Sequence, residues 1–266
     1  IQYIGEARSL ALSGRDLSGK WSPISLTSSN SWYAELPGLI LLPAAVLFWD
    51  NPMLSAQITH VLMGSLMPLL LAGISFGLFQ NKRMAMLTAL IASLNPWFFQ
   101  FSRLAFESFF SIFFYLFGIC ILLLARGKYK LFAILPFFLG FFQYQGHKLL
   151  LVPFVFLLTL YFLYDRIVGA KPRRSKLSVD ELSVVVVLIF TVVLTGIFAV
   201  RLPNQEAIKR TSHITILNDE LLSAKVNEER RLSIENPLQK FFTNKVSVVV
   251  DDSMSKFFGS FNPVYL

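Results

Sequence analysis

Charged residues are scarce in this chain of 266 residues. Asp, Glu, Lys and Arg together make up 15% of it, whereas about a quarter of a typical soluble domain is charged. Apolar residues make up 55%, with 27 Phe, and the mean hydropathy is +0.59. This composition excludes an ordinary soluble domain and predicts an all-α, polytopic helical membrane protein.

Cysteine is nearly absent, since Cys120 is the only one and lies within an apolar run. A single cysteine cannot form a disulfide within the chain, so cysteine usage does not indicate a redox compartment. The sequence also lacks His-x-x-x-His, Cys-x-x-Cys, a Walker loop and Gly-x-Gly-x-x-Gly. It therefore predicts no metal-binding residue and no evident cofactor, and it leaves dependence on a divalent metal open.

Basic residues gather in every second loop between the apolar runs. These loops contain Lys82, Arg83, Arg126, Lys128, Lys130, Arg166, Lys171, Arg173, Arg174 and Lys176. The loops between them hold only Arg103 and Lys148. Cytoplasmic loops of membrane proteins are enriched in Lys and Arg, so the pattern predicts which loops are inside. The net charge of +8 is then explained by orientation and anionic membrane lipids rather than by nucleic acid.

A membrane helix needs about 20 apolar residues, or fewer where neighbouring helices or membrane thinning help, and six runs qualify. They are 54–79, 84–101, 104–125, 130–145, 148–166 and 182–201, of which the fourth is the shortest. The sequence therefore predicts a six-helix membrane domain over 54–201. With the basic loops inside, segments 1–53 and 202–266 both lie on the outer face.

The two outer segments contain shorter helical patterns. The run 36–50 carries Pro43 and is short for a membrane span, so it is interpreted as an interfacial or re-entrant helix. Residues 3–12 favour a short amphipathic helix that ends at Ser13-Gly14. Residues 219–232 and 237–258 favour two amphipathic helices within the long outer loop.

The first group of candidate site residues is Arg103 and Glu107. They are four positions apart at the predicted start of a helix, so they are expected to share a face. A carboxylate in a first helical turn is favoured by the helix dipole. The two residues are either an interfacial ion pair or part of an outward-facing pocket. In the pocket, Arg103 holds a phosphate and Glu107 orients a sugar hydroxyl or a catalytic group.

The second group is the polar stretch 143–148, Gln-Tyr-Gln-Gly-His-Lys, between two apolar runs. It is either a hydrated turn with Tyr144 in the aromatic belt of the membrane interface, or a site in which His147 and Lys148 complete phosphate binding.

Other polar residues have simpler interpretations. Glu6 is expected to form a solvated pair with Arg8, with a catalytic role as the alternative. His60 is expected to be a buried, hydrogen-bonded histidine, with a proton-transfer or metal role as the alternative. Asn95-Pro96-Trp97 is interpreted as a helix kink with an interfacial Trp rather than as a site.

Several short motifs follow one another along the chain. They are Ser9-Leu10-Ala11-Leu12-Ser13-Gly14-Arg15-Asp16, Glu35-Leu36-Pro37, Asn95-Pro96-Trp97, Ser102-Arg103-Leu104-Ala105-Phe106-Glu107 and Tyr144…Lys148…Pro153. Their order and spacing resemble those of bacterial and archaeal membrane glycosyltransferases of the GT-C superfamily, in particular the protein O-mannosyltransferase and aminoarabinose-transferase-like group. Segment 220–266 likewise resembles the large outer loop that follows the seventh membrane helix in that group.

The resemblance implies an enzyme that takes a sugar from a polyprenyl-phosphate-linked donor. The acceptor would be a glycan, lipid or protein on the extracytoplasmic face of the cell membrane. It also implies a membrane helix before Ile1 and a catalytic Asp just upstream of Ile1, so that this chain is an internal fragment without that base. The pair Gly5-Glu6 is similar to the acidic motif, but it lies too close to Ser9.

The resemblance also implies roles for individual residues. Glu107 falls near the second outer acidic position of the family and is the main catalytic candidate in this chain, with Glu6 as the weaker one. His147 and Lys148 fall where the family binds the donor phosphate, and Arg103 and Tyr144 are the candidates that complete this site. The Tyr144-to-Lys148 order differs from the family pattern.

Two other functions are compatible with the same residues. A transporter or lipid flippase would use the outer cations for binding without chemistry, and a non-catalytic membrane scaffold would need only the long outer loop. Transporters commonly contain internal repeats and charges near the middle of the membrane. This chain has no evident repeat and its outer charges lie at one interface, which favours the enzyme.

Overall fold

The computed structural model describes most of the chain as helices. The described residues are 2–15, 17, 37–103, 106–167, 178–201, 219–232 and 244–259. They form eleven α-helices and two 3-10 helices and contain no strand, which confirms the predicted all-α class. The chain divides into two compact units, Ile1–Arg201 and Leu202–Leu266.

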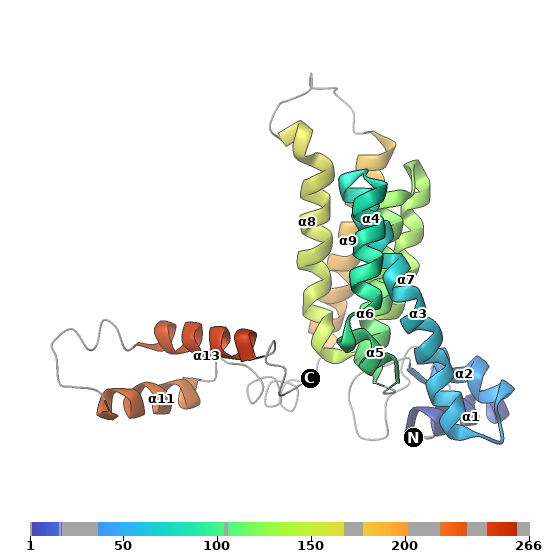
Figure 1. Cartoon of the computed structure of the whole chain (residues 1–266), viewed down its shortest axis with the longest axis horizontal. Coiled ribbons are helices and arrows are strands. Elements are labelled where there is room, and N and C mark those ends of the chain that lie inside the picture. The colour runs from blue at the N-terminus through green and yellow to red at the C-terminus, as the bar shows by residue number, and fades with distance from the viewer. Residues whose placement is uncertain are drawn as a thin grey trace. The chain divides into compact units, whose positions relative to one another are not determined.

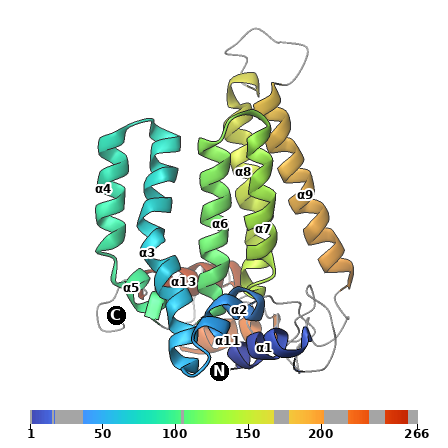
Figure 2. The same cartoon turned by 90° about the vertical axis from the view of Figure 1, so that its right-hand side faces the viewer.

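The first unit is built around six roughly parallel α-helices (Figures 1 and 2). They are α3 (Pro52–Phe79), α4 (Lys82–Ser93), α6 (Glu107–Leu124), α7 (Ile134–Phe141), α8 (Lys148–Ile167) and α9 (Val179–Arg201). Helix α3 packs against α4 and α6, α6 packs against α7, and α8 packs against α9. Consecutive helices alternate in direction, so every second connection falls at the same end of the bundle.

Shorter helices occur at both ends of this bundle. Helices α1 (Gln2–Ser13), α2 (Pro37–Leu47) and α5 (Pro96–Arg103) lie at one end, which we call the α5 end (Figure 2). The 3-10 helix η1 (Gly127–Ala133) joins α6 to α7 at the other end, and η2 (Gln145–His147) joins α7 to α8 at the α5 end. The helix predicted over 3–12 is confirmed, and the run 36–50 is helical over Pro37–Leu47; its interfacial or re-entrant position stays a prediction.

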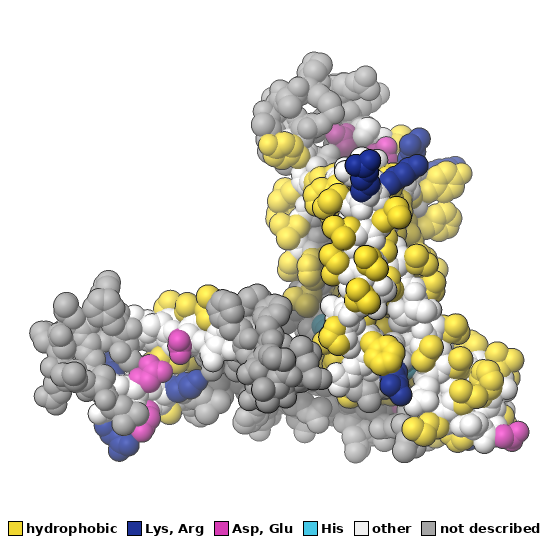
Figure 3. All heavy atoms as spheres, in the orientation of Figure 1, with side chains coloured by type: hydrophobic (Ala, Val, Ile, Leu, Met, Phe, Trp, Pro, Cys, Tyr) yellow, Lys and Arg dark blue, Asp and Glu magenta, His cyan; other side chains and the backbone are white. Residues whose placement is uncertain are grey.

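Basic side chains are concentrated at the end opposite to α5, which we call the basic end. Lys82 and Arg83 begin α4, Arg126 follows α6, and Lys128 and Lys130 belong to η1. Figure 3 shows hydrophobic side chains over much of the visible flank of the bundle, with Lys and Arg gathered mainly at this end. Exposed leucines and valines on α3, α4, α8 and α9 provide this apolar flank.

The predicted apolar run 84–101 is not one continuous helix: it forms two helices that meet at the predicted kink, Asn95-Pro96. Helix α4 ends at Ser93, α5 begins at Pro96, and the two are bent by 55°. Proline lacks the backbone N–H that would continue the helix, and its ring clashes with the preceding turn. The side chain of Asn95 accepts a hydrogen bond from the Trp97 backbone N–H at 2.9 Å and so caps the new helix.

The predicted fourth apolar run begins as a 3-10 helix and becomes α-helical only at Ile134. Gly127 opens this segment with a φ of +57°, a conformation that favours glycine. The segment remains helical to Phe141, four residues short of the predicted end. The fourth run is therefore a mixed helix rather than a uniform α-helix.

Two described helices are long and apolar enough to cross a membrane, Pro52–Phe79 and Val179–Val200. A third candidate is the bent pair of α4 and α5, taken as one broken span. Within the described residues, the other apolar helices are shorter, including 108–124 and 150–164. These long apolar helices indicate a membrane protein.

The interior of the first unit consists of two hydrophobic clusters, each with several buried aromatic side chains. One cluster joins α1, α2, α3 and α6 and includes Phe109, Phe110 and Met67. The other joins α6, α7, α8 and α9 and includes Phe137 and Phe141. On α3, Gly73 and Gly77 allow close approach to α6, since a Cβ atom on Gly77 would lie 2.6 Å from the Cβ of Leu123. Small residues at this spacing commonly mediate packing between membrane helices.

The second unit contains two described helices, α11 (Asp219–Leu232) and α13 (Lys245–Gly259). They pack through Leu222 and Val226 of α11 and Val248 of α13. The predicted helix over 219–232 is confirmed. The one predicted over 237–258 is confirmed from Lys245 onward, and residues 237–243 lie outside the described residues.

Candidate functional site

The candidate site residues belong to several elements at the α5 end of the bundle. Arg103 ends α5, Glu107 begins α6, and His147 and Lys148 lie where η2 meets α8. Because α6 and α7 run in opposite directions, the start of α6 and the end of α7 lie at the same end (Figure 2). The fold thus brings elements from three parts of the sequence to one end.

Lys148 is buried, with 2% of its surface exposed. Its Nζ atom lies 4.2 Å from the centre of the Phe198 ring and 5.7 and 5.9 Å from those of Phe141 and Phe142. Aromatic faces attract cations, and this attraction is stronger away from water. Phe198, on α9, was missed in the sequence because its apolar neighbours on both sides make it look like any other membrane-facing residue.

His147 is half-buried beside Lys148. Its ring packs edge-on against the Tyr144 ring with a centroid separation of 4.8 Å, and its backbone carbonyl accepts a hydrogen bond of 3.3 Å from the Tyr115 hydroxyl. Burial lowers the pKa of His147 from its ordinary value of 6.5, because removal from water disfavours the charged imidazolium. The neutral imidazole is therefore the favoured form at neutral pH.

Buried polar groups form hydrogen bonds at this corner of the bundle. Gln143 is fully buried, and its amide nitrogen donates to the Leu139 carbonyl of the preceding helix α7 at 3.1 Å. Ser111 on α6 donates to the Gly140 carbonyl on α7 at 3.0 Å. The Ser111 and Tyr115 hydroxyls thus join α6 to the end of α7 and to η2, whereas the Gln143 bond is local. Sequence reasoning did not single out Tyr115, because a tyrosine within an apolar run is common in membrane helices.

Arg103 and Glu107 do not share one helix, so the prediction that they lie on one helical face is wrong. Arg103 is the last residue of α5, whereas Glu107 is the first of α6. Phe106 between them is extended, with φ −93° and ψ 131°, and this conformation interrupts the helical path. Arg103 is exposed, and its guanidinium carbon lies 5.4 Å from the centre of the Phe99 ring. The side chain of Glu107 lies outside the described residues.

Glu6 is buried rather than solvated, with 1% of its surface exposed. It lies between α1 and α2, since a Cβ atom on Gly38 would be 3.1 Å from the Cβ of Glu6. Arg8 instead donates to the Trp49 carbonyl and has its guanidinium carbon 5.0 Å from the centre of the Trp49 ring. The expected solvated Glu6–Arg8 pair is therefore wrong.

His60 is a buried, hydrogen-bonded histidine, as expected. Its Nδ1 lies 2.8 Å from the Ala56 carbonyl and its Nε2 lies 3.3 Å from the Phe106 carbonyl. A neutral imidazole donates from one nitrogen only, and the shorter contact favours Nδ1–H as the donor to Ala56. Among the described residues, no group of three His, Cys, Asp or Glu side chains is placed to hold a metal ion.

The arrangement at the α5 end is suited to binding an anion. A buried ammonium with a neutral imidazole in the adjacent residue offers a strong cation and a hydrogen-bond donor in a site of low dielectric constant. Arg103 offers a second, exposed cation at the same end of the bundle. No protein-family model, curated protein or solved structure matches the chain.

Proposed function

We propose that this protein is a membrane glycosyltransferase that uses a polyprenyl-phosphate-linked sugar as donor. Its acceptor is a glycan, lipid or protein on the extracytoplasmic face of the cell membrane. The observation that carries the proposal is Lys148, a buried cation at the helix ends beside the half-buried His147. Ionisable groups so close to apolar membrane segments commonly mark functional sites. The motif order resembles that of the GT-C superfamily, and this resemblance is the reason for proposing that the anion bound near Lys148 is the phosphate of the sugar donor.

Six membrane crossings belong to this proposal. Helix α6 has 18 residues and α8 has 20, so they are about 27 and 30 Å long, close to the thickness of the hydrocarbon core. The seven residues of η1 and eight of α7 add up to about 26 Å, because a 3-10 helix rises more per residue. The bent α4–α5 pair is the remaining short crossing.

The chemistry requires two functions at the α5 end. An acceptor hydroxyl attacks the anomeric carbon of the sugar, the bond from that carbon to the phosphate oxygen breaks, and polyprenyl phosphate leaves. Lys148, His147 and Arg103 stabilise the negative charge that develops on the leaving phosphate. A carboxylate takes the proton of the acceptor. Within this chain, Glu107 is the main candidate for a catalytic carboxylate and Glu6 is the weaker one.

The test uses the purified protein in proteoliposomes with a panel of polyprenyl-phosphate hexoses and pentoses. Replacement of Lys148 by Ala should lower the release of polyprenyl phosphate by about 10²–10³-fold, as expected for loss of a charge-stabilising group. Lys148→Arg keeps the charge and should retain more activity. Arg83→Ala removes an exposed cation at the basic end and should change the rate less than twofold. Turnover of Lys148→Ala at the wild-type rate would exclude the proposed phosphate site.

A transporter or lipid flippase is the second candidate, and the bent α4–α5 pair favours it. Helices broken within the membrane commonly line the binding sites of transporters. The same proteoliposomes separate the two functions, since a flippase moves the intact sugar lipid between leaflets without releasing free polyprenyl phosphate. Movement of intact lipid without cleavage would support the transporter and contradict the enzyme.

A further inference from the structure

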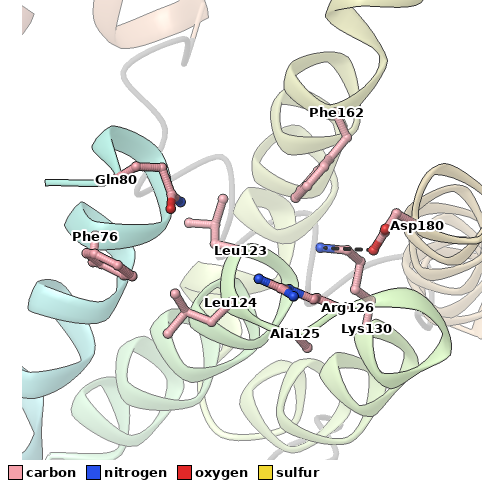
Figure 4. A pocket seen from close by; sticks show the side chains of 9 residues that line it. All are labelled: Phe76, Gln80, Leu123, Leu124, Ala125, Arg126, Lys130, Phe162 and Asp180. Atoms are coloured by element: carbon pink, nitrogen blue, oxygen red, sulfur yellow. Dashed lines mark ion pairs between the residues drawn. The ribbon is translucent and has the colours of Figure 1, made fainter.

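A pocket of about 320 Å³ lies at the basic end of the bundle, away from the candidate glycosyl-transfer site (Figure 4). It is lined by Phe76, Gln80, Leu123, Leu124, Ala125, Arg126, Lys130, Phe162 and Asp180. Its lining combines apolar side chains from α3, α6 and α8 with three charged groups. A site of this mixed character fits an amphiphile better than a purely polar ion.

The buried cation of this pocket is already engaged within the fold. Lys130 is 3% exposed, and its Nζ lies 3.8 Å from Oδ1 of Asp180. The same Nζ donates to the Leu122 carbonyl at the C-terminal end of α6. Asp180 also accepts a hydrogen bond of 2.7 Å from the backbone N–H of Gly127. The negative charge of Asp180 and the negative end of the α6 dipole are therefore already largely compensated by Lys130 and by the Gly127 N–H.

Arg126 is the cation that remains available in this pocket. It follows α6, is exposed, and takes part in no ion pair with another described residue. In Figure 4 its guanidinium points into the space between the α3 side chains and the Lys130–Asp180 pair. A planar guanidinium forms two parallel hydrogen bonds to a phosphate, a geometry that an ammonium group cannot match.

We propose that this pocket binds the headgroup of an anionic phospholipid from the leaflet at the basic end. Arg126 holds the lipid phosphate, Gln80 supplies polar contacts, and the apolar wall of Phe76, Leu123 and Leu124 contacts the glycerol and the start of an acyl chain. Basic pockets between membrane helices on the cytoplasmic side are known to take such headgroups. The inference does not depend on the proposed sugar transfer, which concerns the opposite end.

The test compares two exposed cations of the same connection, only one of which lines the pocket. Arg126→Gln and Lys128→Gln change the net charge equally, and Lys128 is not among the lining residues. The purified full chain is kept in detergent with equal amounts of phosphatidylglycerol and phosphatidylcholine of matched chains, and the retained lipids are counted by native mass spectrometry. In detergent no charged bilayer surface contributes a general attraction.

The wild-type chain should retain phosphatidylglycerol in preference to phosphatidylcholine. Arg126→Gln should weaken this retention about tenfold, the effect of losing one strong charge-assisted contact. Lys128→Gln should change it less than twofold. Arg126→Lys, which keeps the charge but not the planar guanidinium, should give an intermediate loss.

Three results would overturn the proposal. Equal losses in Arg126→Gln and Lys128→Gln would indicate general surface attraction rather than a pocket. Equal retention of the two lipids by the wild-type chain would exclude recognition of the anionic headgroup. Displacement by inorganic phosphate at the same concentration as a soluble short-chain phosphatidylglycerol would show that the pocket binds phosphate alone and not a lipid.

Discussion

The two ends of the helical bundle each contain one buried lysine. Lys130 at the basic end is 3% exposed and Lys148 at the α5 end is 2% exposed. In both cases Nζ lies 4.2 Å from the centre of a phenylalanine ring, Phe162 for Lys130 and Phe198 for Lys148. The two ammonium groups therefore have the same burial and one similar aromatic contact.

The remaining contacts of the two lysines differ. Lys130 donates to the Leu122 carbonyl and pairs with Asp180, so its charge is balanced by a carboxylate from another helix. Lys148 is enclosed by two further phenylalanine rings. Ring faces stabilise a cation although they carry no net charge. Lys130 therefore links η1 to α6 and α9 through a hydrogen bond and an ion pair, whereas the aromatic contacts of Lys148 link the start of α8 to the end of α7 and to α9.

The largest expected effect concerns which side of the membrane each end faces. In a Cys120→Ser background, Lys128→Cys at the basic end should react with a membrane-impermeant maleimide only from the cytoplasm. Ser13→Cys at the end of α1 should react only from outside. Both native side chains are exposed, and Gly127 is avoided because its φ of +57° disfavours a side chain. Labelling is measured in intact and permeabilised cells.

Labelling of Lys128→Cys in intact cells would show that the basic end faces outward, which reverses the predicted orientation. The candidate glycosyl-transfer site would then face the cytoplasm, and the proposed reaction on the outer face would be excluded. Equal labelling of both variants only after permeabilisation would also contradict the predicted orientation.

The second prediction concerns the Lys130–Asp180 ion pair at the basic end. Asp180→Asn should lower the free energy of unfolding by about 2 kcal/mol, because it leaves the buried Lys130 with less compensation. This is below the usual cost for a fully buried pair, since Asp180 is 49% exposed. The measurement is thermal unfolding of the purified protein in detergent.

The double variant Lys130→Met with Asp180→Asn tests whether the two charges depend on each other. It should lose less stability than the sum of the two single variants, because neither charge is then left without the other. Additive losses would show that the two side chains act independently and that the charge pair does not join the helices.

The smallest expected effect is a pH dependence confined to the α5 end. Burial lowers the pKa of His147 from 6.5, so the unfolded chain binds this proton at a higher pH than the folded one. The contribution of His147 to stability is therefore constant well above pH 6.5 and is lost as the pH falls below it. His147→Gln should remove this part of the pH dependence of unfolding, while Asp180→Asn should leave it in place.

An unchanged pH profile in His147→Gln would show that the imidazole is equally free to bind a proton in both states. That result would contradict the lowered pKa that follows from the burial of His147.

Much of the fold could be predicted from local patterns. The apolar runs located the helices, and Pro96 with Asn95 supplied the signal for the break in the run 84–101, which sequence reasoning interpreted as a mere kink. The interruption at Phe106 had no such signal, because nothing in its side chain requires an extended backbone. This hidden break is the reason that Arg103 and Glu107 were wrongly placed on one helical face.

The candidate site was less predictable than the helices. The polar stretch 143–148 marked His147 and Lys148 as unusual, but the partners that surround them come from α6, α7 and α9. Glu6 was expected to be solvated, since an acidic residue beside a basic one in an amphipathic segment usually is. Its burial depends on α2 covering α1, which composition alone does not reveal.

The class of the protein, the positions of most helices and the alternation of basic and non-basic connections can be read from the amino-acid sequence. They follow from local hydropathy and from charge, which act over a few neighbouring residues. The contacts of Lys130 with Asp180, fifty positions away, and of Lys148 with Phe198 are evident only in the folded chain. Such contacts depend on which helices pack together, and a periodic run of apolar residues is compatible with many partners.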